Sequence, residues 1–130
     1  MSNKIFIFAI TYIVTLMTIS EIQNLLNAEI VCGKDKISQT VDRAFASDLM
    51  SDVLTLKSNQ IMLITGLCNI QTIRTMEMAD LNTVIFVRGK KATEDMIDIA
   101  QENDMIVLQT AYSMFRTSGI LWEAGIKPVF

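Results

Sequence analysis

Residues 61–66, with the sequence IMLITG, hold four apolar residues in a row before a threonine and a glycine. A short apolar run without any charge is typical of a strand whose two faces are both buried. Residues 69–80 follow with apolar side chains at helical spacing, and Asn69 is placed to cap the helix. The stretch therefore predicts a buried strand and a helix that packs on it. The side chains expected on the inner side of that helix are Ile70, Ile73, Met76 and either Met78 or Ala79.

The same order of strand and helix occurs twice more downstream. Residues 83–87 predict a second buried strand, and residues 93–101 predict a helix with Thr93 as its cap. Residues 105–108 predict a third strand, and residues 112–123 predict a last helix. Three strand–helix units in succession favour an α/β domain with a mainly parallel sheet and helices on both faces. The inward side chains expected on the last helix are Phe115, Ile120 and Leu121, with Gly125 just beyond its end.

Residues upstream of this alternation predict two further helices and two strands. Residues 19–27 read as a short amphipathic helix that Thr18 caps, and residues 28–33 as a strand that ends in a turn at Gly33. Residues 41–46 alternate weakly and predict another strand. A helix is expected to start after this strand, with Ser47 or Asp48 as its N-terminal cap.

The first 16 residues stand apart from this pattern. Residues 5–16 are almost entirely apolar, but the run is shorter than the ~20 residues that cross a membrane. We therefore assign residues 1–16 to a hydrophobic extension outside the fold and residues 17–130 to a single domain. The extension has two interpretations. An over-long gene start would leave a cytoplasmic protein, and a true leader would associate it with a membrane.

Composition removes several classes of function. The chain has no histidine, which excludes the common Ser-His-Asp and Cys-His catalytic arrangements. Its net charge is −3 and its basic residues are scattered, so we expect no nucleic-acid partner. Cys32 and Cys68 lack the spacing of a zinc site and are expected to be buried, reduced thiols. We expect no metal and no cofactor, and we interpret the methionines as core residues.

Ligands of open α/β sheets bind where the carboxyl ends of the strands meet the helix N-termini. An arginine and exposed helix N–H groups at that edge suit a small anion or a nucleotide. Each residue there also has a plain structural interpretation, as a turn glycine, a helix cap, a charge that complements a helix dipole or a solvated loop charge. The ligand-binding candidates are Asp48, Ser51, Asp52, Thr65, Gly66, Asn69, Arg88, Gly89 and Thr110.

Trp122 lies near the end of the last predicted helix and is the only tryptophan of the chain. If exposed, it is a good anchor for a partner or for self-association, because exposed aromatic side chains are enriched at interface hot spots. The alternative is that it packs against the last residues, 126–130. We expect a homo-oligomer with Trp122 as the interface candidate.

Several segments together resemble the DRTGG domain in its small stand-alone bacterial form, over about residues 17–126. The resemblance implies a three-layer α/β/α sandwich with a mixed sheet, similar to the N-terminal domain of HPr kinase/phosphorylase. The literal Asp-Arg-Thr-Gly-Gly string is absent, with partial matches at Asp42-Arg43-Ala44 and Thr65-Gly66. The segments that carry the resemblance are ASDLMSDVL (46–54), the pattern of residues 61–80, VIFVRGKKATEDMIDIAQENDMIVLQT (84–110) and GILWEAGI (119–126).

The resemblance implies a regulatory or ligand-sensing module, since related domains occur beside CBS domains in longer proteins. The sequence has no phosphate-binding loop of the kinase type, so it predicts no kinase activity. We therefore expect a non-catalytic module that binds a small anionic ligand, a nucleotide or a partner protein at the carboxyl edge of the sheet. The alternative is a structural interaction subunit without a ligand.

Overall fold

The computed structural model describes residues 16–56 and 60–130. Six strands form one sheet in the order β2-β7-β6-β5-β4-β8, and two short strands, β1 and β3, pair separately. The strands are β1 (Met17–Thr18), β2 (Glu29–Cys32), β3 (Thr40–Val41), β4 (Arg43–Ala46), β5 (Ile61–Thr65), β6 (Thr83–Phe86), β7 (Ile106–Gln109) and β8 (Lys127–Pro128). The helices are α2 (Ile19–Leu25), η1 (Lys34–Lys36), α3 (Met50–Val53), α4 (Ile70–Ala79), α5 (Glu94–Glu102) and α6 (Met114–Glu123).

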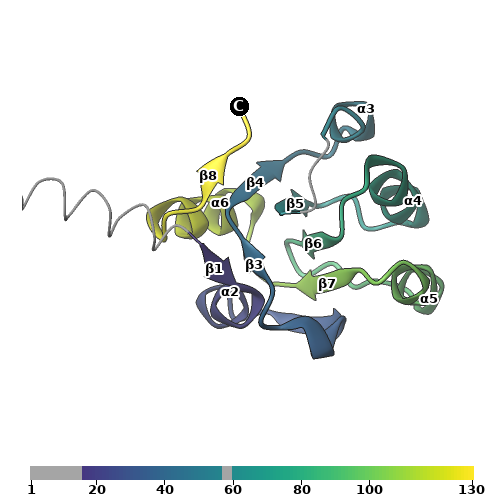
Figure 1. The fold of residues 1–130 in the computed structure, drawn as a ribbon, viewed down its shortest axis with the longest axis horizontal. Coiled ribbons are helices and arrows are strands. Elements are labelled where there is room, and N and C mark those ends of the chain that lie inside the picture. Colours follow the sequence, from purple (N-terminus) through teal and green to yellow (C-terminus); the bar gives the residue numbers. More distant parts are fainter. Residues whose placement is uncertain (1–15, 57–59) are drawn as a thin grey trace, which may run out of the picture.

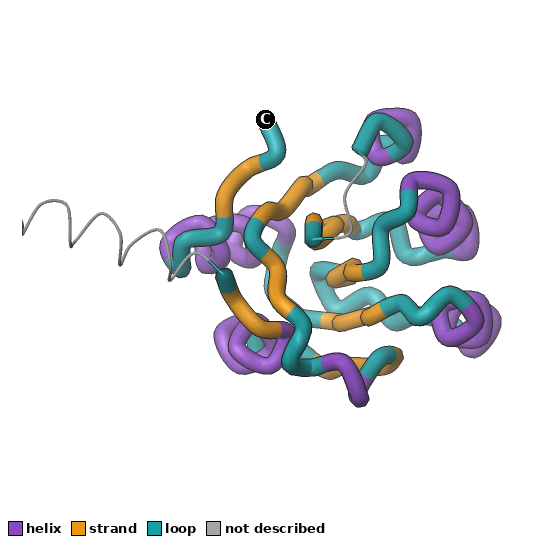
Figure 2. Tube along the Cα trace, in the orientation of Figure 1, coloured by secondary structure: helices purple, strands orange, loops and turns teal. Residues whose placement is uncertain are grey.

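The molecule is a three-layer α/β/α sandwich, as expected. Strands β8, β4, β5, β6 and β7 are parallel, and only β2 joins the large sheet antiparallel. Helices α3, α4 and α5 cover one face of the sheet, and α2 and α6 cover the other (Figure 1). The tube in Figure 2 shows the strands as a middle layer between the two groups of helices. The predicted mainly parallel sheet with helices on both faces is confirmed.

Each central strand sends alternate side chains into two separate cores, which explains its continuous apolar sequence. In β5, Ile61 and Leu63 join the core beneath α3, α4 and α5, whereas Met62 and Ile64 join the core beneath α2 and α6. The same alternation continues in β6 and β7. A strand with polar residues at alternate positions would have left one of these cores unfilled.

Three of the predicted helix caps are present. Thr18, Asn69 and Thr93 each accept a hydrogen bond from the backbone N–H three residues further on. Each bond satisfies one of the N–H groups that the first turn of a helix leaves without a partner. The C-terminus of α6 is capped by backbone groups. The Gly125 N–H donates to the Trp122 carbonyl and the Ile126 N–H donates to the Leu121 carbonyl, which is the pair of hydrogen bonds of a Schellman motif.

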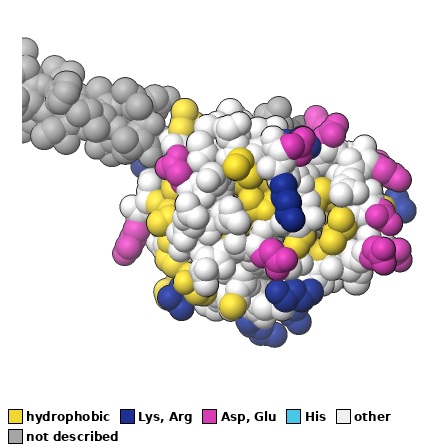
Figure 3. Space-filling view, turned by 90° about the horizontal axis from the view of Figure 1, so that it is seen from below, with side chains coloured by type: hydrophobic (Ala, Val, Ile, Leu, Met, Phe, Trp, Pro, Cys, Tyr) yellow, Lys and Arg dark blue, Asp and Glu magenta, His cyan; other side chains and the backbone are white. Residues whose placement is uncertain are grey.

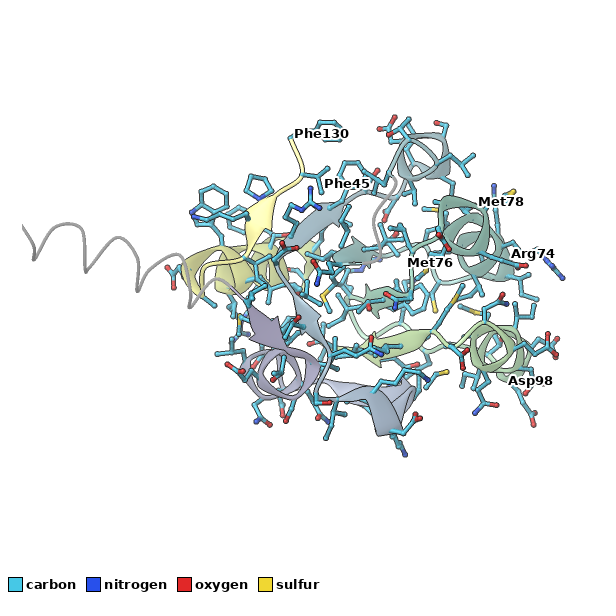
Figure 4. All side chains as sticks on the ribbon, viewed as in Figure 1. Phe45, Arg74, Met76, Met78, Asp98 and Phe130 are labelled. Carbon is cyan, nitrogen blue, oxygen red and sulfur yellow. The ribbon has the colours of Figure 1, made fainter. Side chains whose placement is uncertain are left out.

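Three details of the sequence interpretation are wrong. Residues 41–46 form two strands rather than one, because β3 pairs with β1 and β4 pairs with β5 and β8. Ile70 and Phe115, expected to face inward, are 37% and 88% exposed, and each lies in the first turn of its helix. Met78 is exposed and Ala79 buried, so the second of the two options for α4 is correct. Figure 4 shows Met76 directed toward the sheet and Met78 directed away from it.

The hydrophobic extension falls on residues 1–15, which lie outside the described residues, so both interpretations of it stay open. Among the residues that are described, every helix is too short or too polar to cross a membrane.

Candidate functional site at the carboxyl edge of the sheet

The parallel strands end level with one another, so their following loops meet along one edge. Ala46 of β4 is in register with Ile64 of β5, Thr65 with Phe86 of β6, and Phe86 with Gln109 of β7. Because α4, α5 and α6 each follow one of these strands, their N-termini also lie on this side. Four loops and three helix N-termini thus converge where the sequence predicts a ligand site.

Asp48, in the loop after β4, is fastened to the end of β5. Its Oδ1 accepts a hydrogen bond of 2.8 Å from Thr65 Oγ1 and another of 2.8 Å from the Gly66 N–H. Thr65 Oγ1 in turn accepts from the Leu67 N–H at 3.1 Å. The sequence analysis gives Asp48 as one of two possible caps of α3, and this prediction is wrong. That helix begins at Met50, with Leu49 at its N-cap position and no side-chain cap.

Thr65→Val should lower the free energy of unfolding by about 1.5 kcal/mol, because it removes a hydrogen bond to a carboxylate from a side chain with no exposed surface. Urea unfolding followed by circular dichroism measures the change. Thr65→Ser keeps the hydroxyl and should recover most of the stability. A Thr65→Val variant as stable as the unaltered chain would show that the hydrogen bond to Asp48 contributes nothing to stability.

Arg88 and Gly89, after β6, form a tight turn that is tied to the loop after β7. Both residues have positive φ, 60° and 73°, and the Lys90 N–H donates to the Val87 carbonyl across the turn. Two central residues at positive φ are the mark of a type I′ turn. Outside the turn, the Arg88 N–H donates to the Tyr112 carbonyl at 2.7 Å and the Gly89 N–H donates to the Thr110 carbonyl at 2.9 Å.

Arg88 is the unusual residue of this edge. Four described non-glycine residues have positive φ, and the other three are asparagine or aspartate: Asn27, Asp80 and Asp104. Those residue types adopt this conformation readily, whereas a long side chain there costs about 1–2 kcal/mol. The Arg88 side chain is exposed and forms no hydrogen bond or ion pair with any described residue. The fold thus holds a strained arginine with its guanidinium toward solvent.

Three further cations surround Arg88 in sequence or space. Lys90 and Lys91 follow it, and Lys91 Nζ lies 3.8 Å from a carboxylate oxygen of Glu29. Arg116, in the first turn of α6, stacks on the Tyr112 ring at 3.8 Å from its centroid. Figure 3 shows several basic side chains gathered at one margin of the face seen from below, with others elsewhere on that face. The loops after β6 and β7 therefore form a positively charged rim.

Of the other candidate residues, Thr110 and Asn69 have structural roles, whereas Ser51 and Asp52 are exposed. Thr110 is buried, and its Oγ1 donates to the Leu26 carbonyl at 2.7 Å, so it fastens α2 to the end of β7. Asn69 is the cap of α4, its plain structural interpretation. Ser51 and Asp52 are exposed on α3.

Sequence reasoning missed Arg116 and Lys90 as members of this edge. Arg116 follows Tyr112 by four residues, but Tyr112 precedes Ser113, the N-cap of α6, so the stacked pair joins the loop after β7 to the first turn of the helix. Lys90 follows Gly89 in the loop after β6. In the fold, the positive charge of Lys90 acts on Cys68, which lies in the loop after β5. Burial raises the pKa of the Cys68 thiol, and Lys90 offsets part of that rise.

Both cysteines are free thiols: Cys32 is buried as expected, while Cys68 is half-buried. Burial also raises the pKa of Cys32, whose Sγ donates to the Met105 carbonyl at 3.3 Å, and Lys36 offsets part of this rise. A folded-state pKa above the unfolded value means that the folded chain holds the proton longer. Stability should therefore fall as pH rises through the ordinary thiol pKa of about 8.5.

Urea unfolding at about pH 7.5 and pH 9.5 measures this effect on either side of the ordinary thiol pKa. The free energy of unfolding should be lower at the higher pH. The Cys32→Ala/Cys68→Ala variant should lose part of that slope, and an unchanged slope would assign the pH dependence to other groups.

Three hollows in the described surface have volumes of about 300, 500 and 410 Å³. The first is apolar and lies between α6 and the strands β4 and β8. The other two are polar and are lined by residues at the opposite, amino edge of the sheet, around Gly33 and Gln60 respectively. None of these three hollows is lined by Asp48, Thr65 or Arg88.

Within residues 16–56 and 60–130, no three side chains of histidine, cysteine, aspartate or glutamate gather as a metal site. No protein-family model matches the sequence, and no curated protein matches it. A solved structure does match in fold. It contains the CBS and DRTGG domains of the regulatory region of a pyrophosphatase from Clostridium perfringens, complexed with the activator diadenosine tetraphosphate.

The two structures superpose with a TM-score of 0.64 at 15% sequence identity, over 79% of this chain and 45% of the pyrophosphatase chain. This chain has the fold of part of that regulatory region. It spans less than half of the neighbour's length, and the shared part belongs to a regulatory region rather than to a catalytic domain. The expected likeness is thus confirmed only at the level of the fold, as a likeness to a region that consists of CBS and DRTGG domains.

Proposed function

We propose that residues 17–130 form a non-catalytic regulatory module that binds a small anionic ligand, of the nucleotide class, at the carboxyl edge of the sheet. The observation that carries this proposal is Arg88, held at φ 60° with its guanidinium free of partners among the described residues. Strain of this kind persists where the surrounding structure imposes it, and it is concentrated at ligand-binding sites.

The electrostatics of the edge support an anion. Arg88, Lys90 and Arg116 lie on the side where α4 and α6 present their N-termini, and the first turns of these two helices hold no acidic residue, unlike that of α5. The partial positive charge of a helix N-terminus and the fixed donors of a guanidinium both favour phosphate groups. The exposed N-terminal turns leave backbone N–H groups for phosphate oxygens.

The solved neighbour supports the nucleotide class. Its regulatory region, whose fold this chain shares in part, is complexed with diadenosine tetraphosphate, an activator with a chain of phosphates. A positively charged edge suits a ligand with several phosphates better than an uncharged, apolar molecule.

A regulatory role also fits the residues at the edge better than catalysis does. The chain has no histidine, and the carboxylate oxygen Oδ1 of Asp48 already accepts two hydrogen bonds from Thr65 and Gly66. An aspartate fixed in this way positions a loop. Arg88 is left as a binding group with no nucleophile or base beside it among the candidate residues.

Thermal unfolding of the full chain in the presence of ATP, diadenosine tetraphosphate or inorganic phosphate tests the proposal. A ligand that binds only the folded state should raise the transition temperature by a few degrees at about 100 times its Kd. Arg88→Ala should abolish the shift, because alanine keeps the Cβ and the strained backbone but removes the guanidinium.

Arg74→Ala is the matched control, since Arg74 projects from α4 away from the sheet (Figure 4) and should leave the shift unchanged. A shift with phosphate alone would identify a simple anion site. A nucleotide shift that survives Arg88→Ala, or no shift with any of the three compounds, would contradict the proposal and favour the interaction-subunit alternative.

A further inference from the structure

Helix α6 exposes two large aromatic side chains on one side. Phe115 is 88% exposed and Trp122 is 65% exposed. They are seven residues apart, which is close to two helical turns, so both project from the same side of the helix. Aromatic side chains of this size are the usual anchors of protein interfaces, and a solvated surface gives them no packing.

Two small residues, Ser118 and Gly119, lie between these aromatics. A Cβ built on Gly119 would contact nothing within 4 Å, so this chain's own packing does not require a glycine there. Glycine inside a helix is unfavourable relative to alanine. A glycine at position 119 is therefore explained if a second backbone packs closely against α6 at this point.

The order large, small, small, large is symmetric about the midpoint between Ser118 and Gly119. A surface with this symmetry is complementary to itself when a second copy lies across it in the opposite direction, as a two-fold axis requires. We propose that α6 pairs antiparallel with α6 of a second copy of this chain, with Gly119 at the crossing and Phe115 of each copy against the partner's Trp122.

The charges on α6 fit the same arrangement. Arg116 lies near the start of the helix and Glu123 at its end, and both are exposed. Antiparallel pairing brings Arg116 of one copy to the end that carries the partner's Glu123, at both ends of the contact. Parallel pairing would place like charges together.

The hollow beside α6 continues this surface. Trp122 and Leu121 line it from the helix, Phe45 and Pro128 line it from β4 and β8, and Phe130 lines it from the segment after β8. Phe45 and Phe130 pack edge to face with their ring centroids 5.9 Å apart (Figure 4). The partner's Phe115, placed against Trp122, lies at the mouth of this apolar hollow of about 300 Å³.

The neighbouring sheet edge does not offer a rival way to dimerise. The edge strand β8 is only two residues long and consists of Lys127 and Pro128, both exposed. A proline has no N–H to donate to a new strand, and an edge lysine disfavours strand pairing. The helix, not the sheet edge, therefore supplies the contact.

Sedimentation of the full chain over about 1 to 100 μM tests the pairing, with the emission of Trp122 recorded in parallel. Since Trp122 is the only tryptophan, its emission should shift to the blue over the same concentrations at which the mass doubles. Gly119→Gln fills the crossing point with an exposed, helix-forming side chain and should weaken dimerisation at least tenfold. Met78→Gln, on the exposed side of α4, is the control and should change neither signal.

Charge exchange separates the antiparallel helix pair from any other association. Arg116→Glu and Glu123→Arg should each weaken the dimer, and the double variant should restore it. A chain that is monomeric throughout, a dimer unaffected by Gly119→Gln, or a double variant no tighter than the single variants would each overturn the proposal.

Discussion

Replacing Phe86 by alanine should lower the free energy of unfolding by about 4 kcal/mol, as expected for a fully buried phenylalanine. Phe86 ends β6, the strand between β5 and β7, and its side chain has no exposed surface. It belongs to the core beneath α3, α4 and α5, so its loss leaves a cavity that several elements cannot close at once. Urea unfolding followed by circular dichroism measures the loss.

Phe86→Leu is the matched control, because it keeps most of the buried volume and should cost less than about 1.5 kcal/mol. An alanine variant no less stable than the leucine variant would show that this strand is not the packed centre of the domain.

Gly33→Ala should cost about 3 kcal/mol, for two reasons that add. Gly33 has a φ of 85°, which strains a residue with a Cβ. A Cβ there would also lie 2.9 Å from the Met105 carbonyl oxygen and 3.0 Å from the Ile106 Cα, closer than atoms pack in proteins. The backbone of β2 would have to move away from β7, its antiparallel partner.

Gly89→Ala separates these two reasons. Gly89 has a similar φ of 73°, but a Cβ there would contact nothing within 4 Å. Its replacement should therefore cost only about 1 kcal/mol, the conformational part. Equal losses at the two positions would show that β2 and β7 do not approach as closely as the structure has them.

The sheet could be predicted from the sequence because each central strand is buried on both faces. That requirement leaves an apolar run such as residues 61–64 with no charge in it, followed by Thr65 and Gly66 where the chain leaves the core. The caps Asn69 and Thr93 could be predicted for the same kind of reason, since a cap is a local hydrogen bond between residues three apart.

Features set by distant parts of the chain could not be predicted. Residues 41–46 divide into β3 and β4 because two different partners, β1 and β5, pair with them. The hydrogen bonds between Asp48 and Thr65 depend on the register of β4 against β5, which local sequence does not encode. Ile70 and Phe115 were misplaced because contacts with distant strands decide which side of α4 and α6 packs on the sheet, and Phe115 lies on the same exposed side of α6 as Trp122.

The candidate site was predicted at the level of loops rather than of contacts. The rule that ligands bind at the carboxyl ends of parallel strands selected Thr65, Gly66, Arg88 and Thr110, and the fold brings their loops to one edge. The strained backbone of Arg88 and the stacking of Arg116 on Tyr112 emerge only in three dimensions. These two features supply the charged rim on which the proposed function rests.

The most direct test of that function is to locate the bound ligand by amide chemical shifts. Titration of the ¹⁵N-labelled full chain with ATP should move the amide signals of Gly66, Gly89 and Lys90 most, because these lie along the carboxyl edge. Gly33 and Lys36, which line the polar hollow at the amino edge, should stay in place. Largest shifts at Gly33 and Lys36, or none anywhere at saturating ATP, would contradict an anion site at the carboxyl edge.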